Sequence, residues 1–456
     1  MNALPPLDEL NAFLTAHPDA DQFTLVFTDL CGVARGKVLR RAEIEAAFRD
    51  GRFMPGSIMS LDVTGTDVEE TGLVWEDGDA DRIARPVSGS LVPSPLEGPR
   101  AGQFIVRMTE ADGTPSVCDP RNVLERVVAR FEELKLTPVA AIELEFYLFD
   151  RDAAAKGAPQ PPLALNGAGR AQHFQAYQLS DLTDFSPFFR DVYESAEAQG
   201  LPARTLISEY APGQMEIVLQ HQPDAMKAAD QAIMFKRLIK LAALKHGMMA
   251  CFMAKPYSAY SGSGMHVHVS LAGEDGANAF ADENPKGNAL MRHAVGGLKA
   301  TMAEMMGIWA PNANSYRRFR AKSYAPVSAT WGVNNRTVSL RIPAGAAPTR
   351  HIEHRIAGAD ANPYLALAGV LAGIHHGITG KMDPGPAVEG NGYDLPSEPF
   401  PLNWFRANEV LRQSAFARDY FGNFLVETFC TIKEAEADRF FAEPTPLDFD
   451  YYLRTV

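Results

Sequence analysis

Pairs of polar side chains interrupt four segments of the chain that otherwise read as apolar β-strands. These segments are Glu143-Leu144-Glu145, Glu209…Glu216, His266-Val267-His268 and Glu353-His354-Arg355. Residues i and i+2 of a strand point to the same face of a sheet, so each doublet directs two polar groups to one side. A buried carboxylate costs free energy unless it is paired or bound to a metal. The pattern therefore predicts a sheet with one face that can hold divalent metal ions, although the Glu143/Glu145 doublet alone would also suit an edge strand with a solvated face.

The histidine doublet follows a glycine-rich segment, Ser261-Gly262-Ser263-Gly264, where the backbone can approach a ligand closely. A single histidine is more often a polar residue satisfied by its neighbours than a ligand, but two at this spacing favour a functional role. Carboxylate oxygens combined with one imidazole suit Mg²⁺ or Mn²⁺ better than zinc.

Arginines are dense around the last doublet, where Glu353 is accompanied by Arg336, Arg341, Arg350 and Arg355. Arginine binds phosphate and carboxylate groups in a bidentate manner, so this segment indicates phosphate binding beside the metals and hence ATP-dependent chemistry. The alternative is a solvated surface ladder. The chain lacks the GxxxxGK[ST] of a P-loop, a GxGxxG after a strand and a GxSxG nucleophile motif.

The composition limits the class of protein. The 456 residues are 46% hydrophobic and 22% charged, which is typical of a globular protein of two or three domains. A net charge of −13 argues against a nucleic-acid partner. Four scattered cysteines, an acidic N-terminus without signal-peptide features and the absence of a long apolar run predict a cytoplasmic protein with reduced thiols and no membrane association.

Two regions differ in their patterning. Residues 22–107 alternate short strands with Pro/Gly turns, and "FTLVFTDLCGVARGKVL" predicts a hairpin. Asp119-Pro120 then predicts the start of a helix that runs to about residue 134. We place a domain boundary near residue 115. Further helices are expected from Asp224 to His246 and from Asn362-Pro363 to about Gly377, which makes the chain an α+β protein.

In this order the motifs resemble the glutamine synthetase family. The segments that carry the resemblance are "ELEF", "SEYAPGQMEI", "SGSGMHVHVS", "NRTVSLRIP" and "RHIEHRIAGADANPYLA". The resemblance implies an N-terminal β-grasp-like domain over residues 1–115 and a catalytic domain with a curved antiparallel sheet over residues 116–456. It also implies a homo-dodecamer of two stacked rings, with active sites between subunits.

The resemblance assigns roles to individual residues. It implies one metal site from Glu145, Glu209 and Glu216, and a second from Glu143, His266 and Glu353. His268, Ser270 and Arg341 would contact ATP, while Gly262, Arg318, Arg336 and Arg355 would hold glutamate or its γ-phosphate, with Arg336 and Arg355 acting in catalysis. Asp29 would reach into the adjacent subunit and receive the incoming amine.

The chemistry implied is activation of glutamate by ATP, followed by attack of an amine on γ-glutamyl phosphate. Arginines and metals would neutralise the charge that moves between phosphate and carboxylate. Alkylammonium groups lose their proton near pH ~10, so a carboxylate such as Asp29 would bind the cation and help to remove its proton.

Three positions depart from the family pattern and bear on the substrate. Tyr324 stands where ammonia-using members have a glutamate, Ser261 where they usually have asparagine, and His351 where they have arginine. An aromatic ring could pack along an alkyl chain or face a cation. Segments such as "SIMSLDVTG" and "YAPVSATWGVNNRTVSLRIP" also resemble the glutamate–putrescine ligase branch, which joins glutamate to larger amines.

The acceptor stays open between a putrescine-like polyamine and a small alkylamine, because four cationic residues crowd the segment before Tyr324 and would repel a dication: Arg317, Arg318, Arg320 and Lys322. One alternative is a glutamine synthetase that uses ammonia. Another is a catalytically silent regulatory or structural relative, although all six metal-ligand positions are occupied by suitable residues. Tyr393 matches the position at which some relatives are adenylylated.

Overall fold

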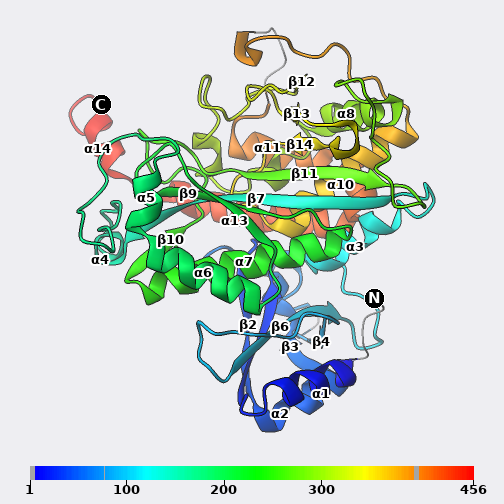
Figure 1. Ribbon diagram of the computed structural model, residues 1–456, viewed down its shortest axis with the longest axis vertical. Coiled ribbons are helices and arrows are strands. Elements are labelled where there is room, and N and C mark those ends of the chain that lie inside the picture. Colours follow the sequence, from blue (N-terminus) through cyan, green and yellow to red (C-terminus); the bar gives the residue numbers. More distant parts are fainter. Residues whose placement is uncertain (1–5, 77, 395–399) are drawn as a thin grey trace.

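Two β-sheets of different size organise the computed structural model, which describes residues 6–76, 78–394 and 400–456. Figure 1 shows the smaller sheet and its helices below the larger part, whose long strands β7 and β11 run side by side across the centre. Helices accompany two sheets whose strands pair mostly in antiparallel fashion, so the predicted α+β class is confirmed.

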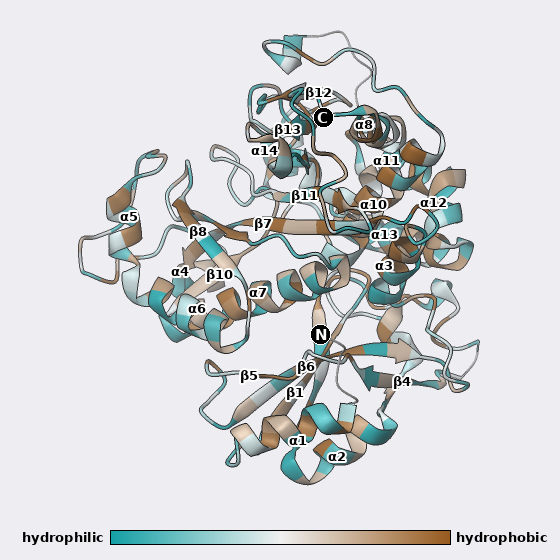
Figure 2. Cartoon of the chain, turned by 45° about the vertical axis from the view of Figure 1, so that its right-hand side comes forward, coloured by the Kyte–Doolittle hydropathy of each residue, from teal (hydrophilic) through white to brown (hydrophobic). Residues whose placement is uncertain are grey.

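The smaller sheet has the strand order β2-β1-β6-β4-β3, with β5 paired to β6. β1 and β2 form the predicted antiparallel hairpin, whereas β1 and β6 run parallel. Helices α1 and α2 cover one side of this sheet (Figure 2). The elements are α1 Pro6–Ala16, β1 Gln22–Thr28, β2 Ala34–Arg40, α2 Arg41–Asp50, β3 Arg52–Pro55, β4 Asp81–Pro86, β5 Val92–Pro93 and β6 Ala101–Thr109.

The larger sheet has the order β12-β13-β14-β11-β7-β9-β8, with β10 paired to β7. All its pairs are antiparallel except β12 with β13. The strands are β7 Thr137–Asp150, β8 Ala203–Ser208, β9 Gln214–Leu219, β10 Met248–Cys251, β11 Met265–Ala272, β12 Trp331–Val333, β13 Leu340–Ile342 and β14 Ile352–His354.

Three helices of the larger part begin where the sequence predicts. Asp119 caps α3 by accepting from the N–H of Arg121, Asp224 caps α7 by accepting from the N–H of Lys227, and Asn362 caps α10 by accepting from the N–H of Tyr364. α3 ends at Ala129, earlier than expected. The helices are α3 Pro120–Ala129, α4 Arg151–Ala155, α5 Leu179–Asp184, α6 Ser186–Ala198, α7 Ala225–Lys245, α8 Ala289–Thr301, α9 Met306–Trp309, α10 Pro363–Thr379, α11 Trp404–Gln413, α12 Ala415–Phe421, α13 Asn423–Ala442 and α14 Pro446–Tyr452.

Helix packing behind the large sheet depends on glycine. α8 and α10 are so close that a Cβ on Gly297 would collide with the backbone of Gly373 and Gly377. The apolar side chains of α7 and α10 and the buried face of the sheet form the main core. This arrangement leaves the opposite face of the sheet for polar residues.

The two parts are joined through buried polar contacts. The Nδ2 of Asn362, at the start of α10, donates to the carbonyl oxygen of Asp29 at 2.9 Å, and Glu436 on α13 accepts from the N–H of Val63 at 2.7 Å. The predicted domain boundary near residue 115 falls between β6 and α3, and it stays a prediction. Within the described ranges, no helix combines the length and the apolar character needed to cross a membrane.

Candidate active site

Strand register places the polar doublets in one row across the large sheet. Directly opposite residues in neighbouring strands share a face. Glu145 on β7 lies opposite Glu216 on β9, and Glu143 lies opposite His266 on β11. His268 lies opposite Glu353 on β14, and Arg341 on β13 is opposite the same glutamate. Side chains that are far apart in the sequence therefore meet on one face of the sheet.

Glu143, His266 and Glu353 form a tight group at the centre of this row. The Nδ1 of His266 lies 2.6 Å from Oε1 of Glu143 and 3.7 Å from Oε1 of Glu353. Burial would raise the pKa of Glu143, but the charges and hydrogen bonds of His266 and His268 hold it well below its ordinary value. The three residues predicted to form one metal site are thus brought together.

Glu145 and Glu216 form a second group beside the first, and Glu209 adjoins them from a turn. The prediction that Glu209 belongs to a strand is wrong, because β8 ends at Ser208 and Glu209 opens the turn to β9. The backbone N–H of Glu209 donates to the carbonyl oxygen of Gln214 at 2.9 Å, which holds the turn. Glu145 accepts from the N–H of Gly264 at 2.9 Å and lies 3.9 Å from Nε2 of His266.

The electrostatics of these carboxylates fit a divalent cation. Burial and the neighbouring charges of Glu143 and Glu145 raise the pKa of Glu216 to about 11. Burial, with Glu145 and Glu143, also raises the pKa of Glu209 to about 7, although Arg336 opposes this shift. Carboxylates crowded in this way repel one another, and a bound cation would remove the repulsion. The donor set of oxygens with one imidazole is suited to Mg²⁺ or Mn²⁺.

Two arginines flank Glu353. The Nη1 of Arg341 donates to Oε2 of Glu353 at 2.7 Å, and Arg355 forms an ion pair with the other oxygen. Burial would raise the pKa of Glu353, but the charge of Arg355, with His268 and His266, lowers it to about 2. Arg318 is also buried and donates to the carbonyl oxygen of Ile356 at 2.8 Å. Three guanidinium groups therefore lie beside the carboxylate cluster.

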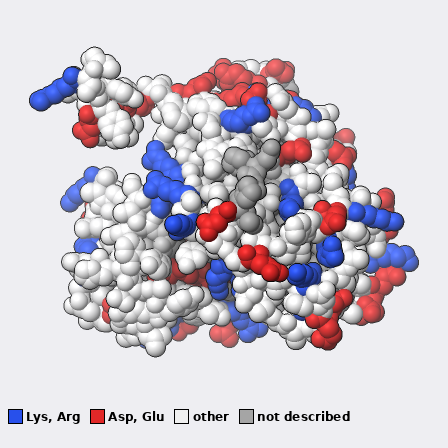
Figure 3. All heavy atoms as spheres, turned by 90° about the horizontal axis from the view of Figure 1, so that it is seen from above, with Lys and Arg blue, Asp and Glu red and all other residues white. Residues whose placement is uncertain are grey.

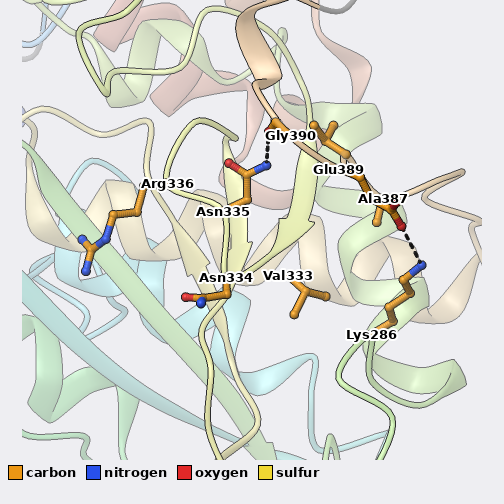
Figure 4. Close-up of a pocket in the computed structure, with 9 residues that line it drawn as sticks. Lys286, Val333, Asn334, Asn335, Arg336, Ala387, Glu389 and Gly390 are labelled. Atoms are coloured by element: carbon orange, nitrogen blue, oxygen red, sulfur yellow. Dashed lines mark hydrogen bonds and ion pairs between the residues drawn. The ribbon is translucent and has the colours of Figure 1, made fainter.

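Arg336 lies at the edge of a separate cavity of about 490 Å³ between β12 and the segment 387–390. Figure 4 shows Arg336 directed away from Lys286 and Glu389, on the other side of Asn334 and Asn335. Its charge still reaches Glu209, whose pKa it lowers against the effect of burial. Arg336 is therefore the most peripheral of the predicted phosphate-binding arginines.

His268 has neighbours that the sequence did not indicate. Its Nε2 lies 3.3 Å from Oε2 of Glu143, and its Nδ1 lies 3.2 Å from Nε2 of His351. His221, which follows β9 and was not predicted to have a role, places its ring centre 6.0 Å from that of His268. No doublet spacing links these residues, so sequence patterns could not bring them together. Ser270, predicted to contact ATP with His268, lies two residues further along β11 on the same face.

Ser261, Gly262 and Tyr324, which were predicted to contact substrate, lie in loops close to Arg318. The carbonyl oxygen of Ser261 accepts from the hydroxyl of Tyr147 at 2.8 Å, and a Cβ on Gly262 would lie 2.7 Å from Cγ of Arg318. Tyr324 is 63% exposed and has a φ of 59°, which is rare for an aromatic residue. The loop is held by Ser323, whose hydroxyl donates to the carbonyl oxygen of Arg320 at 2.6 Å. The ring of Tyr324 is therefore displayed to solvent by a constrained loop.

Tyr393 is anchored to the same loop. Its hydroxyl donates to the carbonyl oxygen of Ala325 at 3.0 Å, and burial raises its pKa while Arg355 and Arg318 lower it. Adenylylation at this residue stays a prediction.

The structure does not bring Asp29 to the row of site residues. Its carboxylate is fully buried at the end of β1, where it accepts from the N–H of Val33 and from Nε of Arg35, both at 2.8 Å. Burial raises the pKa of Asp29, and Arg35 and Val33 oppose this. These contacts fix the Asp29 side chain within its own chain. Its predicted role, which is to receive the amine in the active site of an adjacent subunit, stays a prediction.

The upper face of the molecule carries mixed charge. On the face seen from above, Lys and Arg side chains are interspersed with Asp and Glu, and neutral atoms cover much of the area (Figure 3). Among the described residues drawn on this face, basic side chains do not form the continuous patch that a nucleic-acid partner would require.

Comparisons with known proteins agree with the geometry. Residues 117–452 match the family model described as "Glutamine synthetase, catalytic domain". The chain is 40% identical to gamma-glutamylputrescine synthetase PuuA of Escherichia coli (strain K12), over 94% of this chain and 89% of that relative. It is 34% identical to a glutamate–isopropylamine ligase of Pseudomonas sp, over 92% of both chains. A solved structure described as "GmaS/ADP complex-Conformation 1" superposes with a TM-score of 0.85 at 26% identity, covering 97% of this chain and 99% of the other.

Proposed function

The chain belongs to the glutamine synthetase family, and from this premise we propose that it is an ATP-dependent ligase that joins the γ-carboxyl group of glutamate to an amine. The observation that carries the proposal is the single row of Glu216, Glu145, Glu143, His266, His268, Glu353 and Arg341 across one face of the sheet. This row combines metal-type ligands with phosphate-type ligands, which is the combination that acyl-phosphate formation requires.

Divalent ions, for which we propose Mg²⁺ or Mn²⁺, would be held by the groups Glu145/Glu209/Glu216 and Glu143/His266/Glu353. Bound there, they would neutralise phosphate charge during phosphoryl transfer. Strand register holds these carboxylates close together. Their mutual repulsion would be relieved when a cation binds, which favours cation binding.

The arginines act on the acyl phosphate. The γ-carboxylate of glutamate attacks the γ-phosphorus of ATP, ADP leaves, and the amine then attacks the acyl carbon and releases phosphate. Arg355 and Arg341 are oriented by their ion pairs with Glu353, and Arg318 by its hydrogen bond to the carbonyl oxygen of Ile356. Guanidinium groups that are fixed before substrate binds stabilise developing negative charge without the cost of reorganisation.

The acceptor is an amine larger than ammonia. Tyr324 supports this, since an exposed aromatic ring at this position can pack on an alkyl chain and offers no carboxylate to deprotonate ammonium. The two relatives compared above act on putrescine and isopropylamine according to their names, so both a diamine and a small monoamine fit. We further propose a cytoplasmic homo-dodecamer that has active sites between subunits.

The decisive measurement is ADP release with glutamate, ATP and Mg²⁺ against a panel that contains putrescine, isopropylamine, ethanolamine and ammonia. We expect at least one alkylamine to exceed ammonia in kcat/KM by more than tenfold. If ammonia exceeded every alkylamine, the protein would be a glutamine synthetase. ATP binding without turnover in any reaction would instead indicate a silent relative.

A further inference from the structure

Three histidines from separate segments converge beside the carboxylate row. His221 follows β9, His268 lies on β11, and His351 immediately precedes β14. One ring nitrogen from each of them lies within 4.8 Å of those from the other two. His221 has no part in the proposed function, and His351 stands where the resemblance led us to expect arginine. The cluster is therefore a feature that the ligase chemistry does not explain.

The sheet brings these residues together for identifiable reasons. His268 lies opposite Glu353, so His351, two residues earlier, reaches the same face. After β9, Gln222 forms an isolated bridge with Ala140 of β7. Because β7 pairs with β11, this bridge brings the neighbouring His221 close to β11. The histidines thus occupy fixed backbone positions at the edge of the proposed active site.

The tautomers of two rings are set by their outer hydrogen bonds. The Nδ1 of His351 lies 2.8 Å from the carbonyl oxygen of Thr349, so this nitrogen carries a proton and Nε2 carries a lone pair. The Nε2 of His268 faces the carboxylate of Glu143 at 3.3 Å, which places its proton there. A carbonyl or a carboxylate behind each ring is the arrangement usually found for histidines that bind metals.

The inner nitrogens are spaced like two ligands of one ion. The Nδ1 of His268 and Nε2 of His351 are 3.2 Å apart. Two ligands each 2.0–2.1 Å from a tetrahedral zinc ion are about 3.3 Å apart. At this separation the two nitrogens either share a proton in a hydrogen bond or direct both lone pairs at one metal ion. The rings meet at angles of 49° to 74°, so they do not stack and their edges can converge.

The donor set selects a class of metal. Three imidazoles suit Zn²⁺, Co²⁺, Ni²⁺ or Cu²⁺ and are poor ligands for Mg²⁺. His221 is exposed, which provides access from solvent. We propose that His221, His268 and His351 form a binding site for a divalent transition metal such as Zn²⁺, distinct from the two carboxylate-rich sites. Three protein ligands leave one position open for water or an anion.

A metal bound to the three histidines would affect amide formation, and this consequence rests on the proposed function. His268 is expected to contact ATP, and a metal bound at its Nδ1 would redirect that ring. Zn²⁺ would therefore inhibit amide formation and raise the apparent KM for ATP.

The test uses Co²⁺ as a spectroscopic probe on the full chain after treatment with a chelator and without nucleotide. Nitrogen-rich sites of four or five ligands give visible absorption bands much stronger than those of six-coordinate oxygen sites. We expect one such band that saturates at about one Co²⁺ per chain. His351→Gln and His221→Ala should each abolish the band and weaken the competing binding of Zn²⁺ by at least tenfold. His173→Ala, an exposed histidine outside the cluster, is the matched control and should leave both unchanged.

The carboxylate sites provide the second control. Glu216→Gln should keep the visible band, because Glu216 is not part of the histidine cluster. Unchanged band intensity and Zn²⁺ affinity in both His221→Ala and His351→Gln, with native circular dichroism, would overturn the proposal. Because binding is measured without nucleotide, a protein that failed the amine panel could still show the histidine-dependent band, so failure of the ligase assignment and failure of the metal site are distinguishable.

Discussion

Lys236 is buried in the middle of α7, and the free energy that its buried charge takes from folding can be measured. Its Nζ donates to the carbonyl oxygen of Ala359 at 2.8 Å and lies 5.2 Å from the centre of the Phe252 ring. Burial, with a smaller contribution from the charge of Lys240, lowers the pKa of Lys236 from 10.5 to about 7. This fall corresponds to about 5 kcal/mol, because each unit of pKa is worth about 1.4 kcal/mol.

The sign of the pH dependence follows from this shift. The unfolded chain binds the lysine proton more tightly than the folded protein, so the unfolded state carries more protons between about pH 7 and pH 10.5. Stability therefore rises with pH across this window, and the contribution is lost as the pH falls through about 7. Between pH 7 and pH 9 this one group adds about 2 kcal/mol to the free energy of unfolding.

Lys236→Met removes the charge while it keeps a similar side-chain volume. The variant gives up one hydrogen bond to Ala359, which costs roughly 1–3 kcal/mol. We expect a net gain of about 2–3 kcal/mol at pH 7 that shrinks to nothing by about pH 9. The assay is urea unfolding followed by fluorescence at pH 7, 8 and 9, at one protein concentration.

Lys227→Met is the matched control, since Lys227 is exposed on the same helix. Its effect on unfolding should be small and constant over this pH range. If Lys236→Met destabilised the protein at pH 7, or changed its stability equally at all three pH values, the reasoning about the buried charge would be wrong.

Three further predictions concern the proposed site. Glu216→Gln removes one crowded carboxylate, so we expect ADP release to fall at least 100-fold while the melting temperature of cation-free protein does not decrease; retained turnover would exclude Glu216 from metal binding. Tyr324→Glu should raise the kcat/KM for ammonia relative to alkylamines at least tenfold, and an unchanged ratio would show that Tyr324 does not select the acceptor. Asp29→Asn leaves Arg35 without its buried partner and should cost roughly 3 kcal/mol of stability. It should also cut amide formation per folded enzyme by orders of magnitude while ATP binding is kept, and unchanged turnover would exclude Asp29 from catalysis.

Local patterns were sufficient for three helix starts and for the strands that carry doublets. Asp119, Asp224 and Asn362 each cap the helix that was predicted to start beside them, because a cap depends on a hydrogen bond within three residues. The doublets on β7 and β11 lie on strands, and Glu353 lies on β14 with Arg355 directly after it, because alternation of apolar and polar residues is also a local property. Glu209 was misplaced since it is seven positions from Glu216 and a turn lies between them. His354, between Glu353 and Arg355, points to the opposite face and packs on Trp309 with ring centres 4.3 Å apart, as the period of two requires.

By itself, the sequence determined which side chains are available for chemistry and, through strand periodicity, that each doublet faces one side of a sheet. Only the tertiary structure decided which doublets are neighbours, because register is set by pairing between strands that are distant in the chain. It buried Asp29 against Arg35, which no motif could reveal, and it exposed the ring of Tyr324 to solvent. It also assembled His221, His268 and His351, since their convergence depends on strand order rather than on any spacing along the chain.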